Sequence, residues 1–261
     1  GLTYFTGNSS TNVPANADRL QIALGILGTT LGTLSVFTAN RDDSITMSNV
    51  NLSLSDVRLF GGSGTGGAGN DSLLITNAGL NLAVNGGSDL TTDSIETIRQ
   101  QAGGILNVSG NTDLTLMSGF VELDLADNDF GGSLIISADG STVRVRDIDD
   151  LSVNNIRADS LSLTAPNSLS QDLGSTVAVS VLNLNSANGN IVFANQDNSI
   201  PAVQVTQGQN VTVSNTLATS TTVFGINNAT GNFSLASSDA TINGSLDVGG
   251  DLTLDASNGI G

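Results

Sequence analysis

The sequence contains no cysteine, no histidine, no lysine and no tryptophan, and each absence excludes a kind of chemistry. Without cysteine, the chain can form neither disulfides nor zinc-thiolate sites. Without histidine, it lacks the base of Ser-His-Asp catalysis and the commonest transition-metal ligand. Tyr4 and eight phenylalanines are its only aromatic residues. We therefore expect a protein that is not an enzyme.

Positive charge is also scarce. The formal net charge is −17, and all seven positive residues are arginines. Because a phosphate-binding surface needs clustered cations, we expect no nucleic-acid partner. An anionic membrane surface would likewise repel the chain. Strong acidity favours solubility and suits a protein that works outside the cell.

Targeting and membrane segments are not visible in the sequence. The chain opens on Gly1 and ends on Gly261 within a repeat-like phrase, so we expect a fragment whose signal peptide lies elsewhere. The uncharged run 20–40 contains too much Gly, Thr and Ser for a membrane span, and it alternates like a strand. The expected location is extracellular, on a bacterial surface, without membrane insertion.

Internal repetition is the most informative feature of the sequence. The phrases ANRDDSI, ADNDFGGSL and ANQDNSI begin at Ala39, Ala126 and Ala194, each after an apolar segment. Alternating apolar residues follow each phrase, and the last two copies stay in step. The apolar positions that correspond between these two copies are Leu134 and Ile136 with Val203 and Val205, and Val143 and Val145 with Val211 and Val213.

A shorter period underlies this repeat. Pairs of apolar residues flank one polar residue, typically about 20 residues apart, with Asn, Asp, Gly and Ser between them. These pairs are Val143/Val145, Leu161/Leu163, Leu182/Leu184, Val203/Val205, Phe233/Leu235 and Leu252/Leu254. Short strands joined by Asn and Gly turns at this spacing are typical of a β-solenoid. We predict an all-β, right-handed parallel β-helix with coils of about 20 residues.

The alternative fold is an array of β-sandwiches, which also alternate and turn frequently. The scarcity of aromatic residues and the coil-length period favour the solenoid. Within one continuous domain, we expect diverged coils over 1–105, with a glycine-rich loop at 61–70, and regular coils over 106–261. The segment 93–103 has helix-capping residues but also alternates, so it is either a short helix or a strand.

Several phrases resemble a known family. ADNDFGGSL is followed by DIDDLSV from Asp147 and DSLSLTA from Asp159, and GGDLTLDASNGIG closes the chain. This succession resembles the filamentous haemagglutinin-like exoproteins of Gram-negative two-partner secretion systems and the related giant adhesins. The resemblance extends from about Leu106 to the end, and in diverged form back to Phe37. It implies the repetitive shaft of such a protein, since the family's amino-terminal secretion module is not visible.

Candidate metal ligands come from one glycine-rich motif. Residues 66–74 match the calcium nonapeptide G-G-x-G-x-D-x-U-x, with Asn70 and Asp71 in the ligand region. Calcium is normally shared between turns of adjacent coils, and no second copy follows. A flexible glycine loop is the alternative interpretation. No other cofactor is expected.

The acidic joints between apolar segments are a second candidate. They are Asp42/Asp43, Asp127/Asp129 and Asp147/Asp149/Asp150. Paired carboxylates serve as acid and base in polysaccharide hydrolases. No aromatic residue accompanies them to stack on a sugar, so we interpret these residues as turn formers that bond their own backbone.

The leading hypothesis is a structural and adhesive shaft segment that contacts host-cell or surface glycans or proteins through an unknown, flat polar face. The alternatives are a calcium-stabilised β-roll adhesin segment, a self-assembling extracellular filament or sheath subunit, and a tailspike-like polysaccharide-degrading β-helix. Open solenoid ends are sheet edges, so end-to-end self-association belongs to the third hypothesis, the filament.

Thermal melting with and without a calcium chelator separates the shaft from the β-roll. We expect the same midpoint in both conditions, because ligand binding to the folded state is what would raise it. A lower midpoint in chelator, restored by added calcium, would instead favour the β-roll.

Overall fold

The computed structural model describes the strands before residue 97 by their backbone alone. From residue 97 on, it describes the side chains of most residues as well. The described residues are 2–5, 19–23, 30–37, 44–48, 53–60, 72–76, 80–84, 90–93, 97–100, 104–108, 110–116, 119–218 and 220–261. They contain strands and connecting turns but no helix. Among them, accordingly, no helix is long and apolar enough to cross a membrane.

The chain divides into two compact units, which we call unit 1 (Gly1–Gly132) and unit 2 (Ser133–Gly261). The strands of unit 1 are β1 (Leu2–Phe5), β2 (Arg19–Ala23), β3 (Thr30–Phe37), β4 (Ser44–Ser48), β5 (Ser53–Phe60), β6 (Ser72–Thr76), β7 (Leu80–Val84), β8 (Leu90–Asp93), β9 (Thr97–Gln100), β10 (Gly104–Val108), β11 (Thr112–Thr115), β12 (Phe120–Leu123) and β13 (Asp129–Phe130). Those of unit 2 are β14 (Ser133–Arg146), β15 (Asp150–Thr164), β16 (Ser168–Gln171), β17 (Val177–Asn185), β18 (Ile191–Phe193), β19 (Ala202–Gln207), β20 (Val211–Asn215), β21 (Thr221–Ala229), β22 (Phe233–Val248) and β23 (Leu252–Ile260).

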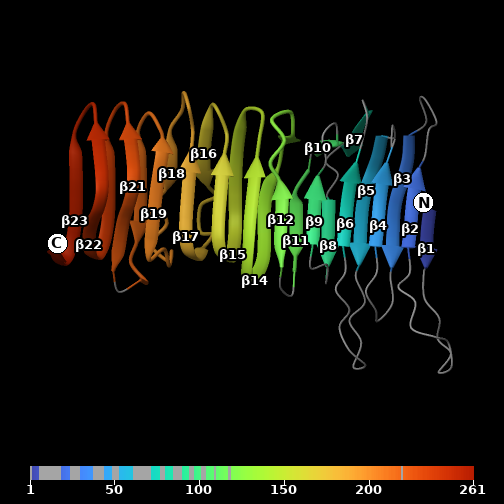
Figure 1. Cartoon of the computed structure of the whole chain (residues 1–261), viewed down its shortest axis with the longest axis horizontal. Coiled ribbons are helices and arrows are strands. Elements are labelled where there is room, and N and C mark those ends of the chain that lie inside the picture. Colours follow the sequence, from blue (N-terminus) through green and yellow to red (C-terminus); the bar gives the residue numbers. More distant parts are fainter. Residues whose placement is uncertain are drawn as a thin grey trace, which may run out of the picture. The chain divides into compact units, whose positions relative to one another are not determined.

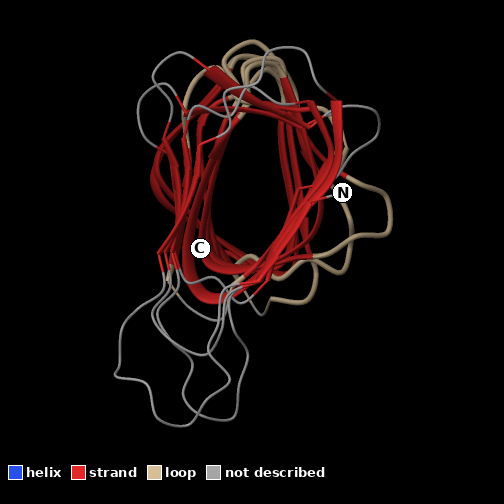
Figure 2. Ribbon diagram, turned by 90° about the vertical axis from the view of Figure 1, so that its right-hand side faces the viewer, coloured by secondary structure: helices blue, strands red, loops and turns tan. Residues whose placement is uncertain are grey.

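Every strand pairing within unit 2 is parallel, and each strand pairs with the strand one coil further on. Partners lie about 20 residues apart in the sequence, as Val143 and Leu161 do, or Leu169 and Ile191. Figure 1 shows the strands of this unit stacked side by side, and Figure 2 shows that strands form the walls of the coils while loops lie at their corners. The fold is therefore a parallel β-solenoid, as predicted, and not a β-sandwich, whose strands would be antiparallel.

Each coil of unit 2 has three walls, and equivalent walls stack into three faces. The first face stacks Val143/Val145, Leu161/Leu163, Leu182/Leu184 and Val203/Val205. The second face stacks Leu151/Val153, Leu169/Gln171, Ile191/Phe193, Val211/Val213, Phe233/Leu235 and Leu252/Leu254. The third face stacks Ile136/Ala138, Ile156/Ala158 and Val177/Val179.

These faces correct one detail of the sequence interpretation. The apolar pairs that form one series in the sequence belong to two faces, because the series leaves the first face after Val205 and resumes at Phe233 on the second. The wide gap between these two pairs marks that change of face. Likewise, the corresponding residues Val143 and Val211 lie on different faces.

The pairings of unit 1 are also parallel, but its coils are less regular. Leu90 pairs with Thr112 after an interval close to that of unit 2, whereas the interval from Val57 to its partner Leu90 is much longer. The extra residues lie between strands. Of the diverged coils expected over 1–105, the glycine-rich loop 61–70 lies outside the described residues. In the ambiguous segment 93–103, residues 97–100 form β9, so the strand interpretation holds there.

The described core consists mainly of aliphatic side chains. Phe193 and Phe233 are among its largest fully buried members. The alternation of β18 is sharp, since Ile191 and Phe193 are fully buried while Val192, between them, is 39% exposed. Burial of an apolar side chain from every second residue of a strand is the main source of solenoid stability.

Phe193→Ala tests this packing. We expect it to lower the free energy of unfolding by about 3–5 kcal/mol, because it removes a fully buried ring and leaves a cavity. Val192→Ala, one residue away on the outer surface, is the matched control and should cost less than about 1 kcal/mol. Chemical denaturation measures both, and equal losses would contradict the assignment of inward and outward positions.

Candidate functional site

The structure gives different outcomes for the predicted site residues. Asn70 and Asp71 lie outside the described residues, as do Asp42 and Asp43, so the calcium loop stays a prediction. Among the residues that the structure does describe, no group of three or more acidic side chains lies close enough to hold a metal ion.

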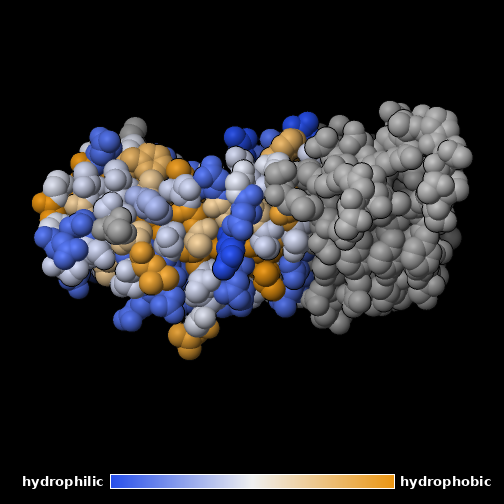
Figure 3. Space-filling view, turned by 90° about the horizontal axis from the view of Figure 1, so that it is seen from below, coloured by the Kyte–Doolittle hydropathy of each residue, from blue (hydrophilic) through white to orange (hydrophobic). Residues whose placement is uncertain are grey.

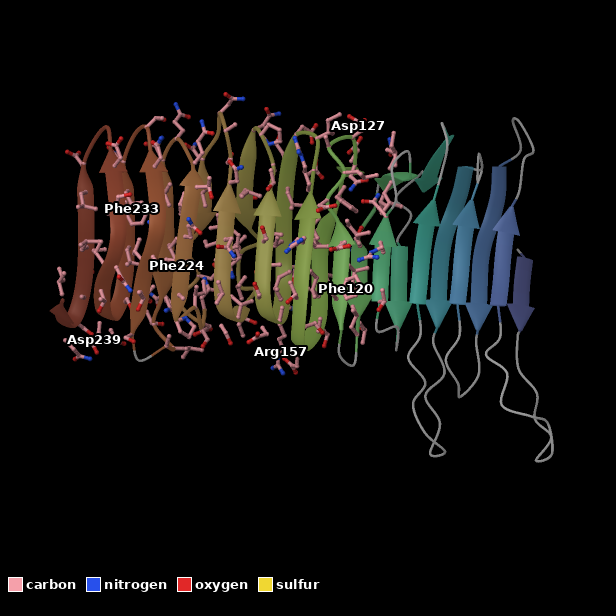
Figure 4. All side chains as sticks on the ribbon, viewed as in Figure 1. Phe120, Asp127, Arg157, Phe224, Phe233 and Asp239 are labelled. Atoms are coloured by element: carbon pink, nitrogen blue, oxygen red, sulfur yellow. The ribbon has the colours of Figure 1, made fainter. Side chains whose placement is uncertain are left out.

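The acidic joint at residues 147–150 behaves as a turn. The Asp147 side chain is fully buried, and its Oδ1 accepts the backbone N–H of Asp149 at 2.9 Å. Asp150 is exposed and accepts a hydrogen bond from the Ser168 hydroxyl of the next coil. The turn-forming role predicted for these residues is therefore confirmed at Asp147 and at Asp149, whose Oδ1 accepts the backbone N–H of Asp150 at 2.6 Å. In the other joint, Asp127 lies exposed in the loop before β13 (Figure 4).

A buried amide pair closes one corner of unit 2. Asn198, fully buried, and Gln171 exchange two hydrogen bonds, at 2.7 and 2.9 Å between their side-chain amides. Asn198 Oδ1 also accepts the N–H of Val177 at 2.8 Å, and its Nδ2 donates to the carbonyls of Phe193 and Ser214. One side chain thus satisfies backbone groups in three coils, which holds this corner in register.

Unit 1 contains the same arrangement. Asn128 is fully buried and exchanges two hydrogen bonds with Gln100, at 2.6 and 2.9 Å. Its Oδ1 accepts the N–H of Leu106, and its Nδ2 donates to the carbonyl of Leu123. Gln100 precedes Gln171, and Asn128 precedes Asn198, by nearly the same number of residues. The corner is therefore a feature of a structural repeat that is longer than one coil.

Regular polar side chains line one edge of the second face. Asn190 Oδ1 accepts the backbone N–H of Asn210, Asn210 Oδ1 that of Asn232, and Asn232 Oδ1 that of Asp251, at 2.9–3.2 Å. Two earlier coils contribute the Asp150–Ser168 hydrogen bond. We call this set the polar ladder; its members are Asp150, Ser168, Asn190, Asn210, Asn232 and Asp251.

Beside the polar ladder runs a column of small, outward side chains. Each lies at an outward position of the second face, either between two inward residues or in register with such a position on the neighbouring coil. In register, the column contains Ser133, Ser152, Ser170, Val192, Thr212, Ser234 and Thr253. We call it the hydroxyl column, because all its members except Val192 carry a hydroxyl group. Together the two rows make a flat polar surface, because neighbouring coils are spaced by only about 4.8 Å.

At one end of the hydroxyl column, a carboxylate joins successive coils. Asp172 follows β16 and accepts hydrogen bonds from the Ser133 and Ser152 hydroxyls and from Asn154 Nδ2, the last at 2.9 Å. Its backbone carbonyl accepts Asn195 Nδ2 at 2.6 Å. The side chain is partly buried, and burial raises the pKa of its carboxyl. The hydrogen bonds outweigh burial and hold the pKa below its ordinary value of 3.8.

The exposed surface is otherwise mixed. Figure 3 shows isolated apolar side chains among polar ones on the face viewed. Leu173, beside Asp172, is 98% exposed, and Leu217 is 63% exposed. The arginines of unit 2 are spread over two faces, since Arg144 is in register with Ser162 on the first face and Arg157 with Ala178 on the third. Figure 4 shows Arg157 projecting from the lower edge of its strand.

The family comparison agrees with this repetition. A family model described as repeats of unknown function (DUF5649) matches residues 68–137 and 140–207, just over half of the chain. The chain belongs to this family. Each matched segment contains one buried amide pair, Gln100–Asn128 in the first and Gln171–Asn198 in the second. No curated protein and no solved structure matches the chain.

Sequence reasoning missed the buried amide pairs. The repeated phrases contain Asn128 and Asn198, but asparagine between Asp and a short apolar strand indicates an exposed turn. The signal that could have found them is the glutamine 27 or 28 residues earlier, which recurs with the phrase.

Asp172→Asn tests the carboxylate that joins the coils. Because its folded-state pKa is depressed, the carboxylate stabilises unit 2 above the unfolded-state pKa and loses this effect as the pH falls through the folded pKa. We expect Asp172→Asn to be less stable than the wild type at pH 7, with the difference shrinking below about pH 4. Urea denaturation at both pH values measures it.

Asp197→Asn is the control, because it removes one exposed negative charge from the neighbouring loop. It should cost less than Asp172→Asn at pH 7. A difference between wild type and Asp172→Asn that is equally large at pH 7 and pH 3 would contradict the role assigned to the carboxylate.

Proposed function

We propose that the chain is a structural and adhesive shaft segment of a large secreted bacterial surface exoprotein, without catalysis. The observation that carries the proposal is the stack of parallel coils in unit 2. Its first and second faces continue from coil to coil with mainly apolar side chains inside and mainly polar side chains outside. Such a stack extends by adding coils and needs no other core, which suits a spacer.

Contact through a flat surface fits the same geometry. The polar ladder fixes its asparagine oxygens on the backbone of the next coil, so these side chains are held before any partner arrives. Preorganised side chains lose little conformational entropy on binding. Single contacts of this kind are weak, and repetition along the stack supplies avidity. The acidic charge of −17 keeps such a surface soluble.

Location is the first test of the shaft proposal. Antibodies raised against the chain should stain intact, unpermeabilised cells that produce the parent protein, and mild protease should release the signal. A cytoplasmic protein stained in parallel is the control for lysis. Staining that appears only after permeabilisation would overturn the proposal.

The adhesive half needs its own measurement. Beads coated with the chain should be retained on the surface that the producing cells colonise, and soluble chain should compete with them. Beads coated with heat-unfolded chain are the control. Surface staining without bead retention would leave a structural shaft and overturn adhesion.

A further inference from the structure

Two periods of different length run along the chain. The coil has about 20 residues, whereas the family repeat has about 70, since its matches cover 68–137 and 140–207. The buried amide pairs give the same repeat length, because Asn198 follows Asn128 by one such interval. A repeat of this length is three coils and roughly a third to a half of a fourth. Corresponding residues of successive repeats therefore cannot lie above one another.

The register of unit 2 displays this offset directly. From Val143, three coils on the first face lead through Leu161 and Leu182 to Val203. The repeat-equivalent residue of Val143 is Val211, which lies beyond Val203 in the sequence and pairs with Ile191 on the second face. One repeat has thus advanced the position by one wall of the coil.

A second position behaves in the same way. Ile136 pairs with Ile156 on the third face. Its counterpart in the next repeat is Val205, which pairs with Leu184 on the first face. Along the chain, the third wall is followed by the first, so this step has the same direction and size as that from Val143 to Val211. The neighbouring Leu134, which pairs with Val153 on the second face, advances further, because its counterpart Val203 lies on the first face.

We infer that the repeat winds around the solenoid, so that each successive copy presents the same residues on a different face, one wall further on for Val143 and Ile136 and two walls further on for Leu134. Two to three repeats complete one revolution, in about seven to ten coils. At about 4.8 Å per coil, one repeat advances about 16–17 Å and a full revolution about 34–48 Å. A residue that belongs to the repeat therefore faces the same side again only after about 34–48 Å.

This arrangement defines the kind of partner that the repeat can bind. A partner that recognises repeat-specific residues must engage one repeat at a time and must be no longer than a few coils along the axis. Neighbouring copies point in different directions, so partners can surround the shaft. A single flat surface meets an equivalent site only once per revolution, which lowers its avidity. The inference depends on coil register and stands apart from the proposed adhesive role.

Paired spin labels test the winding in solution, and the absence of native cysteine makes labelling specific. The double variant Arg144→Cys/Thr212→Cys carries its two labels at outward positions that are equivalent in successive repeats. Arg144→Cys with Gln204→Cys is the matched control, because these positions lie three coils apart on the first face. Circular dichroism and thermal melting verify that both double variants fold.

We expect the control pair to give a spin–spin distance near three coil spacings, about 14 Å before label length. The repeat-equivalent pair should be longer, roughly 20 Å or more, because a corner and part of a wall separate Gln204 from Thr212 at about 3.3 Å per residue. Equal distances, or a shorter one for the repeat-equivalent pair, would overturn the winding. The spin-label distances and the surface staining of producing cells are independent measurements. Failure of the winding can therefore be distinguished from failure of the shaft proposal.

Discussion

Hydrogen bonding between the backbones of successive coils is the constraint on which the structure depends. It spaces coils by about 4.8 Å and places each residue above its partner, so a side chain shares the environment of its neighbours in the column. An inward column is then mainly apolar, as from Leu161 to Leu182 and Val203. On the second face, the polar inward residue Gln171 is hydrogen-bonded to Asn198. An outward column must tolerate close neighbours, which explains the small Ser, Thr and Asn side chains of the second face. The sequence period is a consequence of this spacing.

Corners are where the constraint is hardest to satisfy, because strand pairing stops and backbone groups turn inward. A buried N–H or carbonyl without a partner costs about 1–3 kcal/mol. Asn198 resolves this at one corner by bonding Val177, Phe193 and Ser214 while Gln171 satisfies its remaining capacity. Asp172 uses a charge for a similar purpose at the surface, joining side chains from β14 and β15. Polar side chains thus fix the register that apolar stacking alone leaves open.

The solenoid and its coil length could be predicted because the second half of the chain places an apolar pair on a given wall about once every 20 residues. The assignment of pairs to faces could not, because Val203/Val205 and Phe233/Leu235 look alike, and only pairing distinguishes the walls they occupy. Unit 1 hid its period because the interval between paired residues varies from coil to coil. The burial of Asn128 and Asn198 could not be predicted, because each is buried against a glutamine of the preceding coil that satisfies its side-chain amide.

The mismatch between repeat and coil follows from the likeness of the three walls. Each wall demands the same short alternation of apolar and polar residues, so a segment that fits the first face also fits the second, as Val143/Val145 and Val211/Val213 do. A copied segment need not be a whole number of coils long to preserve the core. It must only end at a corner, where turn residues tolerate variation in length. Surface residues gain no such protection, because each copy faces another direction. The core therefore requires the same alternation of apolar and polar residues on every wall. The outward residues of each copy, in contrast, can be selected separately for binding.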